Sequence, residues 1–417
     1  MSERWGIAGG GMLGLTLALR LAEAGQAVEV IEAQPRLGGL ASEAEIGSVR
    51  WDRFYHVILA TDTYTRTLLR QLDLECDMQW RAVKTGFYAR GRVFPLTTPG
   101  EFLRFPVLNL WEKLRLGLTM VLAPRAKPGR HLEDVTAVEW VRRYSGRGAV
   151  DKFWRPLLVS KLGDKAETVS ASFLHATMVR LMSARKLGVG QEQFGYLPGS
   201  YGRIVRSLSA RLTSLGVGIR TGTDFNAVRG EYKRAVVTVP APVAAKWGNE
   251  FAALGAIPYQ GVVCTSFLLR QPLSDYYITN LGDGGLPFTG VVDMTALVDA
   301  KEFGGHGLVY LPKYVGPQDP VWGRSDTDVT VEAWNGLRRI YPHLTDADRI
   351  ASQVARARYV FPVPTAGHSG RIPPMTTQIP GLYVVNASHI RNGTLNVNET
   401  LQLAEQAAAV LLDQDRG

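Results

Sequence analysis

The sequence predicts an α/β fold in which a parallel sheet is interrupted by a second domain of mixed strands and helices. Residues 5–42 hold a short apolar strand, a glycine-rich turn, an amphipathic helix and a second buried strand, which together make one βαβ unit. Near the C-terminus, a strand at residues 382–385 precedes a helix at about 398–412. Between these ends the pattern is helical over residues 100–190 and strand-rich over residues 259–315. Strands that alternate with helices at both ends indicate one domain interrupted by another.

The first turn carries the spacing Gly9-x-Gly11-x-x-Gly14. Gly9 permits a tight turn, Gly11 lacks the Cβ that would keep a pyrophosphate from the helix N-terminus, and Gly14 lets the helix pack closely on the strand. Glu32 ends the second strand 23 residues after Gly9, where a carboxylate can accept both hydrogen bonds of an adenosine ribose. A glycine-rich turn without a ligand is the alternative, but the strand, the helix and the acid predict a dinucleotide site.

The segment after the second strand indicates which dinucleotide binds. Arg36-Leu37-Gly38-Gly39 continues the motif as R-x-G-G. In FAD enzymes of the glutathione-reductase type, such a segment curls back so that its backbone and the arginine meet the FAD phosphates. An ordinary β-turn is the alternative. The sequence predicts an FAD site formed by Gly9, Gly11, Met12, Leu13, Gly14, Glu32, Ala33, Arg36, Gly38, Gly39 and Leu40.

Composition places the chain among globular proteins. Its 417 residues are enough for two or three domains, with 20% charged and 46% apolar residues. The two cysteines, Cys76 and Cys264, cannot build a disulfide framework or a C-x-x-C redox or zinc site, which suits a reducing cytosol. The glycine motif begins within nine residues of Met1, so we expect no signal peptide, and no apolar stretch is long enough to cross a membrane. We expect a cytoplasmic protein without a metal site.

The net charge of +9 favours anionic partners such as phosphates, sugar nucleotides or lipid head groups. No basic tract interleaved with aromatic residues is present, so the charge does not indicate nucleic acid. A basic surface without a specific partner is the alternative. In the apolar and basic segment 101–122, one helical face holds Trp111, Leu114, Leu118 and Val121. This face predicts either peripheral contact with the inner face of a membrane or packing on the core of the second domain.

The other elements follow from periodicity and turn residues. Residues 83–96 alternate apolar and polar around Arg90-Gly91, which predicts a hairpin with a tight turn. Helices are predicted over residues 64–74, 101–122, 133–145, 150–162, 170–185, 201–215, 326–341 and 345–352, and strands at 218–220 and 235–240. We expect a discontinuous FAD-binding domain of residues 1–80 with 193–258 and 360–417, and a mixed α+β substrate domain of residues 81–192 with 259–359.

Further motifs lie along the rest of the chain: WDRFYH at 51–56, PLLVSKLG at 156–163, GYLPGSYGRI at 195–204, VVTVP at 236–240, PFTGVVDMT at 287–295 and GLYVVNAS at 381–388. With these motifs, the glycine turns, Glu32 and Arg36, the chain resembles the superfamily of FAD-dependent amine oxidases, protoporphyrinogen oxidases and phytoene desaturases. It is similar over nearly its whole length to bacterial protoporphyrinogen-oxidase-like oxidoreductases. The resemblance implies a glutathione-reductase-type, Rossmann-like FAD domain.

Two departures from the family pattern affect the expected FAD contacts. Relatives have a hairpin after the strand near residues 223–225, and because it is shortened here, the adenine contact of that strand is expected at Phe225. Relatives also carry G-[DE] after the last strand and E-G-A at the last helix, where this chain has Asn386-Ala387 and Asn398-Glu399-Thr400. The resemblance implies that Asn386 hydrogen-bonds the ribityl chain or a phosphate. It also implies that the backbone N–H groups of Thr400 and Leu401 face flavin O2.

Candidate catalytic residues follow the second glycine motif. Arg53, Tyr55 and His56 lie in a loop that relatives place beside the flavin ring, where a neutral imidazole can take a proton or donate one to flavin N5 or O4. A structural His56 bonded to the backbone is the alternative. Amine oxidases place a lysine on the strand that floors the substrate pocket, which implies a catalytic place for Lys313 in VYLPKY. Lys161 is expected either to meet an anionic substrate group or to be solvated.

These features predict an FAD-dependent oxidoreductase that removes a hydride from a C–C, C–N or C–O unit, with O2, a quinone or another carrier as acceptor. The substrate class is open between hydrophobic, lipid-linked and anionic sugar molecules. One alternative is a flavin-dependent sugar-nucleotide mutase similar to galactopyranose mutases, in which Arg358, Arg371 and Arg391 clamp a diphosphate, although the mutase C-terminal motif is absent. The other is a flavoprotein scaffold without turnover. No oligomeric state is predicted.

Overall fold

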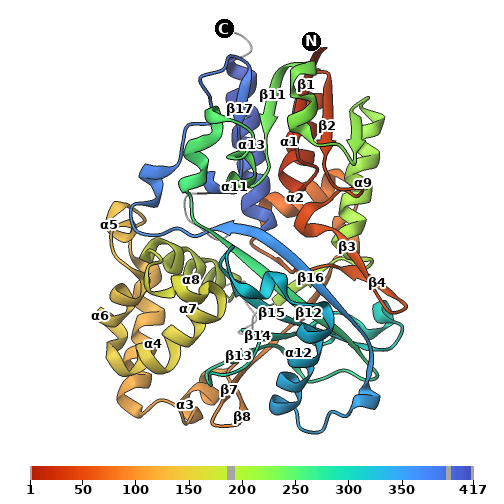
Figure 1. Ribbon diagram of the computed structural model, residues 1–417. Helices are drawn as coiled ribbons and strands as arrows, with labels where there is room; N and C mark the ends of the chain where they lie inside the picture. The colour runs from red at the N-terminus through yellow and green to blue at the C-terminus, as the bar shows by residue number, and fades with distance from the viewer. Residues whose placement is uncertain (1, 186–192, 391–395, 415–417) are drawn as a thin grey trace.

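The computed structural model describes residues 2–185, 193–390 and 396–414. A parallel sheet lies at the end of the molecule that carries both termini (Figure 1). Its strand order is β10-β2-β1-β11-β17. The strands are β1 (Ser2–Ala8), β2 (Val28–Glu32), β10 (Gly218–Thr221), β11 (Tyr232–Val237) and β17 (Leu382–Val384). Neighbouring strands all run parallel. Distant parts of the chain therefore supply one sheet, as the sequence predicts.

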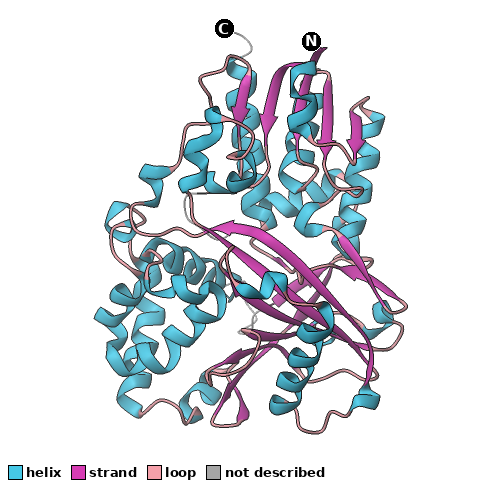
Figure 2. Ribbon diagram, viewed as in Figure 1, coloured by secondary structure: helices cyan, strands magenta, loops and turns pink. Residues whose placement is uncertain are grey.

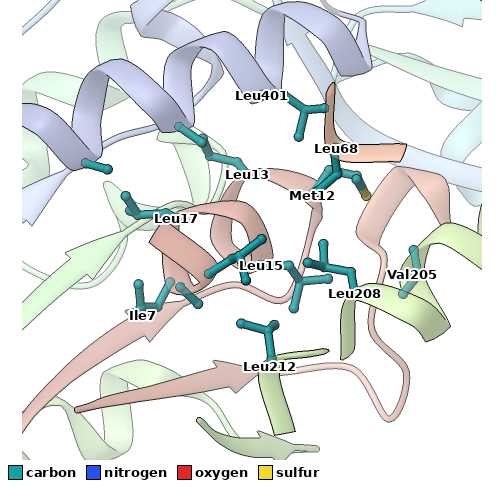
Figure 3. Close-up of a cluster of buried hydrophobic side chains, with 14 of the residues drawn as sticks. Ile7, Met12, Leu13, Leu15, Leu17, Leu68, Val205, Leu208, Leu212 and Leu401 are labelled. Atoms are coloured by element: carbon teal, nitrogen blue, oxygen red, sulfur yellow. The ribbon is translucent and has the colours of Figure 1, made fainter. Parts of the chain in front are cut away.

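Helix α1 (Met12–Glu23) connects β1 to β2 and confirms the predicted βαβ unit. It packs on helices α9 (Ser200–Ser214) and α13 (Val397–Gln414). Helix α2 (Thr63–Gln71) packs on α13. Because α1 is enclosed by these helices and the sheet, its apolar side chains face partners on most sides. The shared core contains Ile7, Leu15, Leu17, Leu68, Leu208, Leu212 and Leu401 (Figure 3).

A larger mixed sheet of seven strands occupies the other end of the molecule (Figure 2). In spatial order its strands are β16 (Arg349–Pro362), β12 (Tyr259–Leu269), β15 (Gly307–Val315), β14 (Gly290–Asp293), β13 (Tyr276–Leu281), β7 (Lys84–Ala89) and β8 (Arg92–Pro95). Every residue of β12 is buried. Helix α12 (Asp326–Ile340) packs on β12 and β16. The β7–β8 hairpin confirms the turn predicted at Arg90-Gly91.

Small strands join the two sheets. Strands β3 (Glu43–Ile46) and β4 (Val49–Asp52) form one antiparallel pair. Strand β9 (Gln193–Tyr196) pairs with β5 (Ile58–Leu59) and β6 (Gln79–Ala82). The loop between β4 and β5 contains the predicted catalytic residues 53–56, so the small strands fix both of its ends.

A helical region lies beside the mixed sheet. Its helices are α3 (Pro99–Arg104), α4 (Leu110–Leu122), α5 (Arg130–Glu133), α6 (Ala137–Ala149), α7 (Arg155–Leu162) and α8 (Ala171–Arg185). The single helix predicted over 101–122 is wrong. Phe105, which precedes Pro106, is extended, and Asn109 begins a new helix by accepting a hydrogen bond of 2.9 Å from the Glu112 N–H.

Two further element predictions are wrong. Residues 345–352 do not form a helix, because the chain makes one short 3₁₀ turn at Asp346–Asp348 and then pairs with β12 as β16. The strand expected near residues 223–225 is absent, since α10 (Phe225–Val228) begins there. Helix α11 (Ala241–Ala244) follows β11. Tertiary pairing decides the first case, because residues 349–362 complete the edge of a sheet whose other strands are distant in sequence.

The division into an FAD-binding and a substrate domain stays our proposal, motivated by the two separate sheets. In the described part of the chain, no helix has the length and apolar character needed to cross a membrane. The same residues contain no cluster of three or more His, Cys, Asp or Glu side chains suited to a metal ion.

Candidate functional site

The glycine turn after β1 has the geometry that each glycine requires. Gly9 has a φ of +111°, in the region that favours glycine. A Cβ on Gly14 would lie 1.9 Å from the Gly9 carbonyl oxygen, so only glycine lets α1 approach the turn this closely. A Cβ on Gly11 would meet no atom within 4 Å. The space over Gly11, at the start of α1, is therefore open to a ligand group.

Glu32 faces this turn from the end of β2. One carboxylate oxygen accepts the Gly10 N–H at 2.6 Å, and the other accepts the Gln34 N–H at 2.8 Å. Each oxygen keeps a second lone pair for a further donor such as a ribose hydroxyl. Glu32 is half-buried, so the carboxylate is held in place but remains accessible.

The R-x-G-G segment curls back onto the first turn. The Gly38 N–H donates to the Gly10 carbonyl at 2.8 Å, and Gly11 and Gly38 form a parallel bridge. Gly38 and Gly39 have φ values of +106° and +56°. Arg36 and Ala33 are exposed and Leu40 is half-buried beside them. Met12 and Leu13 bury their side chains in the core, so only their backbone can face a ligand.

Asn386 lies after β17, at the same edge of the sheet as the glycine turn. It is completely buried, and its Oδ1 accepts hydrogen bonds from the backbone N–H and the hydroxyl of Ser388 at 3.0 and 2.6 Å. Its Nδ2 has no hydrogen-bond partner among the described residues. A buried amide donor without a partner is costly, which fits an acceptor supplied by a bound molecule.

The structure contradicts the contacts expected at Thr400 and Leu401. Helix α13 starts at Val397, and Asn396 caps it by accepting the Glu399 N–H at 3.0 Å. The Thr400 N–H donates to the Asn396 carbonyl at 3.1 Å. Leu401 is buried in the core. The N–H groups that the helix ladder leaves open are those of its first turn, at Val397 and Asn398.

Phe225 also differs from its expected place. Its ring is buried and stacks on Tyr232 with the centroids 6.1 Å apart. The segment that lies against the end of β2 is two to three residues earlier, where the Thr223 N–H donates to the Glu32 carbonyl at 3.0 Å. The short helix α10 displaces Phe225 from this edge. The adenine contact expected at Phe225 stays a prediction.

The loop after β4 connects the glycine turns to the mixed sheet. The Arg53 N–H donates to the Ser42 carbonyl at 2.9 Å, just after the second glycine turn. The Arg53 guanidinium donates to the Arg356 carbonyl on β16 at 2.8 Å. Burial lowers the pKa of Arg53. Arg53 thus ties the start of the loop to the second glycine turn and to β16.

Tyr55 meets the mixed sheet at β15. Its hydroxyl lies 2.9 Å from the Tyr314 hydroxyl, and burial raises the pKa of Tyr55 to about 12. The Tyr310 hydroxyl donates to the Asp52 carbonyl, which ties β15 to β4. Tyr310 and Tyr314 lie on one face of β15, four residues apart. Both remain neutral, because burial also raises their pKa.

His56 completes this cluster. Its ring centroid lies 4.8 Å from that of Tyr201 on α9, and 18% of its side chain is exposed. Nδ1 is 3.9 Å from the nearer Asp52 carboxyl oxygen, too far for a hydrogen bond, and has no partner among the described residues. Burial lowers the pKa of His56 to about 4 and raises that of Asp52 well above its usual range. His56 is therefore neutral near physiological pH, and the burial of both groups disfavours an ion pair between them.

The structure does not bring Lys313 into the cluster. Side chains alternate along a strand, so Lys313 lies on the face of β15 opposite to Tyr314. There it lines a small recess with Val263, Val321 and Glu332 under α12. Lys313 therefore lies on the expected strand but on the face away from Tyr314, and its catalytic role stays a prediction.

Lys161 on α7 has an accessible side chain, yet desolvation and the charge of Arg180 lower its pKa to about 8. Arg180 on α8 donates to the buried Asp62 carboxylate at 2.9 Å. Burial raises the pKa of Glu399 in the first turn of α13, and Arg180 opposes that shift. The sequence did not reveal Arg180 and Asp62, because a separation of 118 residues hides their pairing.

A cavity of about 670 Å³ lies on the same side of α13. Its lining includes Met375, His389, Glu399 and Gln402. The volume is within the range of small-molecule and cofactor sites. Open space over Gly11, the unpartnered amide of Asn386 and the first turn of α13 together fit a bound dinucleotide.

Comparison with known proteins identifies the relatives of this arrangement. A family model for flavin-containing amine oxidoreductases matches residues 14–412. No curated protein matches. A protein from Exiguobacterium sp. 255-15, provisionally described as a protoporphyrinogen oxidase, shares the fold with a TM-score of 0.77, 16% identity and 99% coverage of both chains.

Two further solved structures extend the comparison. Reduced UDP-galactopyranose mutase has a TM-score of 0.74 and 17% identity, covering 99% of this chain and 96% of that chain. Putrescine oxidase bound to putrescine has a TM-score of 0.70 and 15% identity, with 99% of both chains covered. At these identities the likeness shows a shared fold, and it does not distinguish between the activities of these proteins.

Proposed function

Because the chain belongs to the family of flavin-containing amine oxidoreductases, we propose that it oxidises an organic substrate beside Tyr55, His56 and Tyr314. The protein is an FAD-dependent oxidoreductase. FAD, when bound, accepts the hydride that leaves the substrate carbon. The chain itself has to hold the dinucleotide, orient the substrate and move a proton.

The proposed FAD contacts lie along one edge of the parallel sheet. The glycine turn at Gly11 and the half-buried Glu32 serve the pyrophosphate and the adenosine ribose. The second turn at Gly38 lies against the first and closes the same end. Asn386 offers its unpartnered Nδ2 to the ribityl or phosphate part. These assignments rest on open space and free hydrogen-bonding capacity.

The neutral imidazole of His56, in the loop that meets β15 through Tyr55, is the observation that carries the catalytic proposal. With its pKa lowered to about 4, the imidazole is neutral at physiological pH and can accept a proton from a substrate N–H or O–H. Tyr55 and Tyr314 supply aromatic surface and hydroxyl groups that orient the substrate.

The surroundings favour a substrate with an apolar or lipid-linked body and an anionic group. The rings of Tyr314 and Phe361, with centroids 6.3 Å apart, extend the aromatic surface. Lys161 stays mostly protonated near neutral pH with a pKa of about 8, so its charge would attract an anion.

A sugar-nucleotide mutase is less well supported. Arg358 stacks on Trp322 and donates to the Pro317 carbonyl at 2.9 Å. Arg371 donates to the Ala366 carbonyl at 2.9 Å. Both expected diphosphate clamps are therefore engaged within the chain, and Arg391 lies outside the described residues. No observation favours a scaffold without turnover.

The test is anaerobic reduction of the bound flavin, scanned across amines, alcohols, lipid-linked compounds and sugar nucleotides. With a substrate in hand, we expect His56→Ala to slow flavin reduction by about 10²–10⁴-fold while FAD content is retained, because a positioned acid–base group contributes this much. His306→Ala is the matched control, since His306 is also half-buried with an unpartnered Nδ1 but lies before the start of β15. Reduction rates of His56→Ala within a few-fold of wild type would show that His56 is structural.

The pH dependence of stability gives a second check on His56. Below its ordinary pKa of about 6.5, the unfolded chain protonates this residue, whereas the folded protein does so only near pH 4. The free energy of unfolding therefore falls as pH drops from about 6.5 to about 4. The raised pKa of Asp52 changes the free energy of unfolding with pH in the opposite direction. The measured quantity is therefore the difference in the free energy of unfolding between wild type and His56→Gln, taken from urea unfolding at each pH. A difference that does not change with pH would contradict the buried, neutral state.

A further inference from the structure

The outer surface of α3 and α4 is unusually apolar. Leu110, Trp111 and Leu114 are 78%, 65% and 62% exposed. In the described chain, seven of the fourteen exposed large hydrophobic residues lie in this one segment, which makes it a patch and not a scatter. We call it the α3–α4 apolar face, and it consists of Leu103, Leu110, Trp111, Leu114, Leu118, Val121 and Leu122.

The fold does not use this face. Helix α4 packs on α6 through its other side, where Leu116 and Thr119 are buried. The Thr119 hydroxyl lies 2.7 Å from that of Ser145 on α6. Glu112 caps the helix and binds Lys152 at 2.7 Å. Packing of Trp111, Leu114, Leu118 and Val121 on the chain's own core is therefore wrong, and the apolar stripe faces outwards.

The charges around the face identify its partner. Residues 99–130 contain six basic side chains, Arg104, Lys113, Arg115, Arg125, Lys127 and Arg130, against two acidic ones, Glu101 and Glu112. Both acids are engaged in capping boxes, and Glu112 also in an ion pair. Two copies of this face would bring like charges together, whereas an anionic surface would attract it.

We propose that the α3–α4 apolar face docks on a bilayer surface containing anionic lipids. Helix α4 has 13 residues, a length of about 20 Å, so it lies in the interface plane and does not cross the bilayer. Trp111 enters the interfacial zone that tryptophan favours, and the leucines reach the acyl boundary. Arg104, Arg125, Lys127 and Arg130 are exposed around the face and meet the head groups. This docking does not depend on the proposed reaction.

Sedimentation of the full-length FAD-loaded protein with vesicles tests the proposal. We expect binding to phosphatidylcholine vesicles that contain phosphatidylglycerol, much weaker binding to phosphatidylcholine alone, and release as salt rises. Trp111→Ser with Leu118→Ser should weaken binding at least about tenfold, because a short apolar face has little area to spare. Val331→Ser with Val410→Ser removes two exposed valines from α12 and α13 and should leave binding unchanged.

Fluorescence locates the contact. Trp111 is the one tryptophan with an exposed side chain among the described residues, so brominated lipids should quench wild type but not Trp111→Phe. FAD content and thermal unfolding confirm that each variant is folded. Wild-type protein that stays in the supernatant at low salt would overturn the proposal. So would a serine pair that converts a dimer to a monomer without changing vesicle binding, since a second copy would then be the occupant.

Discussion

Helices α1 and α4 have similar lengths and leucine contents but opposite relations to solvent. Helix α1 has 12 residues, of which nine are buried, whereas the buried residues of the 13-residue α4 are Glu112, Leu116 and Thr119. Leu17 of α1 is completely buried and Leu118 of α4 is 51% exposed. An apolar helix in the sequence therefore shows that some surface will be covered, but it does not show what covers it.

The neighbours of each helix explain the difference. Helix α1 lies against the parallel sheet, α9 and α13, so most of its circumference meets protein. Helix α4 has its main contact with α6 on one side, and the side chains opposite that contact face outwards. The same hydrophobic free energy that stabilises the fold through α1 is left available for binding through α4.

Gly11→Val is expected to have the largest effect in α1, a complete loss of bound FAD from a folded protein. The apoprotein has open space at this position, so the fold tolerates the side chain, but the valine would occupy the place of the pyrophosphate. Flavin absorbance after gel filtration measures occupancy, and Gly117→Val, in open space on α4, is the control. Full FAD occupancy in Gly11→Val would refute the assignment of the glycine turn.

Truncation of one leucine in each helix tests the comparison directly. We expect Leu17→Ala to lower the free energy of unfolding by about 2–5 kcal/mol, because it leaves a cavity in the core. Leu118→Ala should change it by no more than about 0.5 kcal/mol, as for other surface substitutions. Urea denaturation of both variants gives the two values. Equal losses would mean that the α3–α4 apolar face is covered in the folded protein.

Replacing one glycine in each helix by alanine is expected to give the smallest changes in stability. The two changes should have opposite signs. Gly14→Ala should destabilise by about 1–3 kcal/mol, since its Cβ would clash with the Gly9 carbonyl and force a backbone shift. Gly117→Ala meets no neighbour within 4 Å and should stabilise by up to about 1 kcal/mol through helix propensity. Thermal unfolding of the two FAD-loaded variants distinguishes them. A stabilised Gly14→Ala would contradict the close approach of helix and turn.

The glycine turns were predictable because their requirements are local. The positive φ of Gly9 and the close contact of Gly14 depend on residues a few positions apart, and Glu32 reaches the turn across one helix. The contacts at Thr400, Leu401 and Lys313 were not predictable in the same way, because each changes when the residue moves by one to a few positions along its helix or strand. One residue changes the face of a strand, and a few residues along a helix separate the open N–H groups of the first turn from those bonded within the helix.

The sequence by itself determined the βαβ unit, the class of nucleotide and the order of strands and helices at both ends of the chain. These features follow from spacing and periodicity within some forty residues. Only the tertiary structure decided that Tyr55 meets Tyr314 across 259 residues, that Arg180 pairs with Asp62, and that the apolar side of α4 points outwards. Such outcomes depend on which surfaces are left after every element has packed, and no local pattern records that.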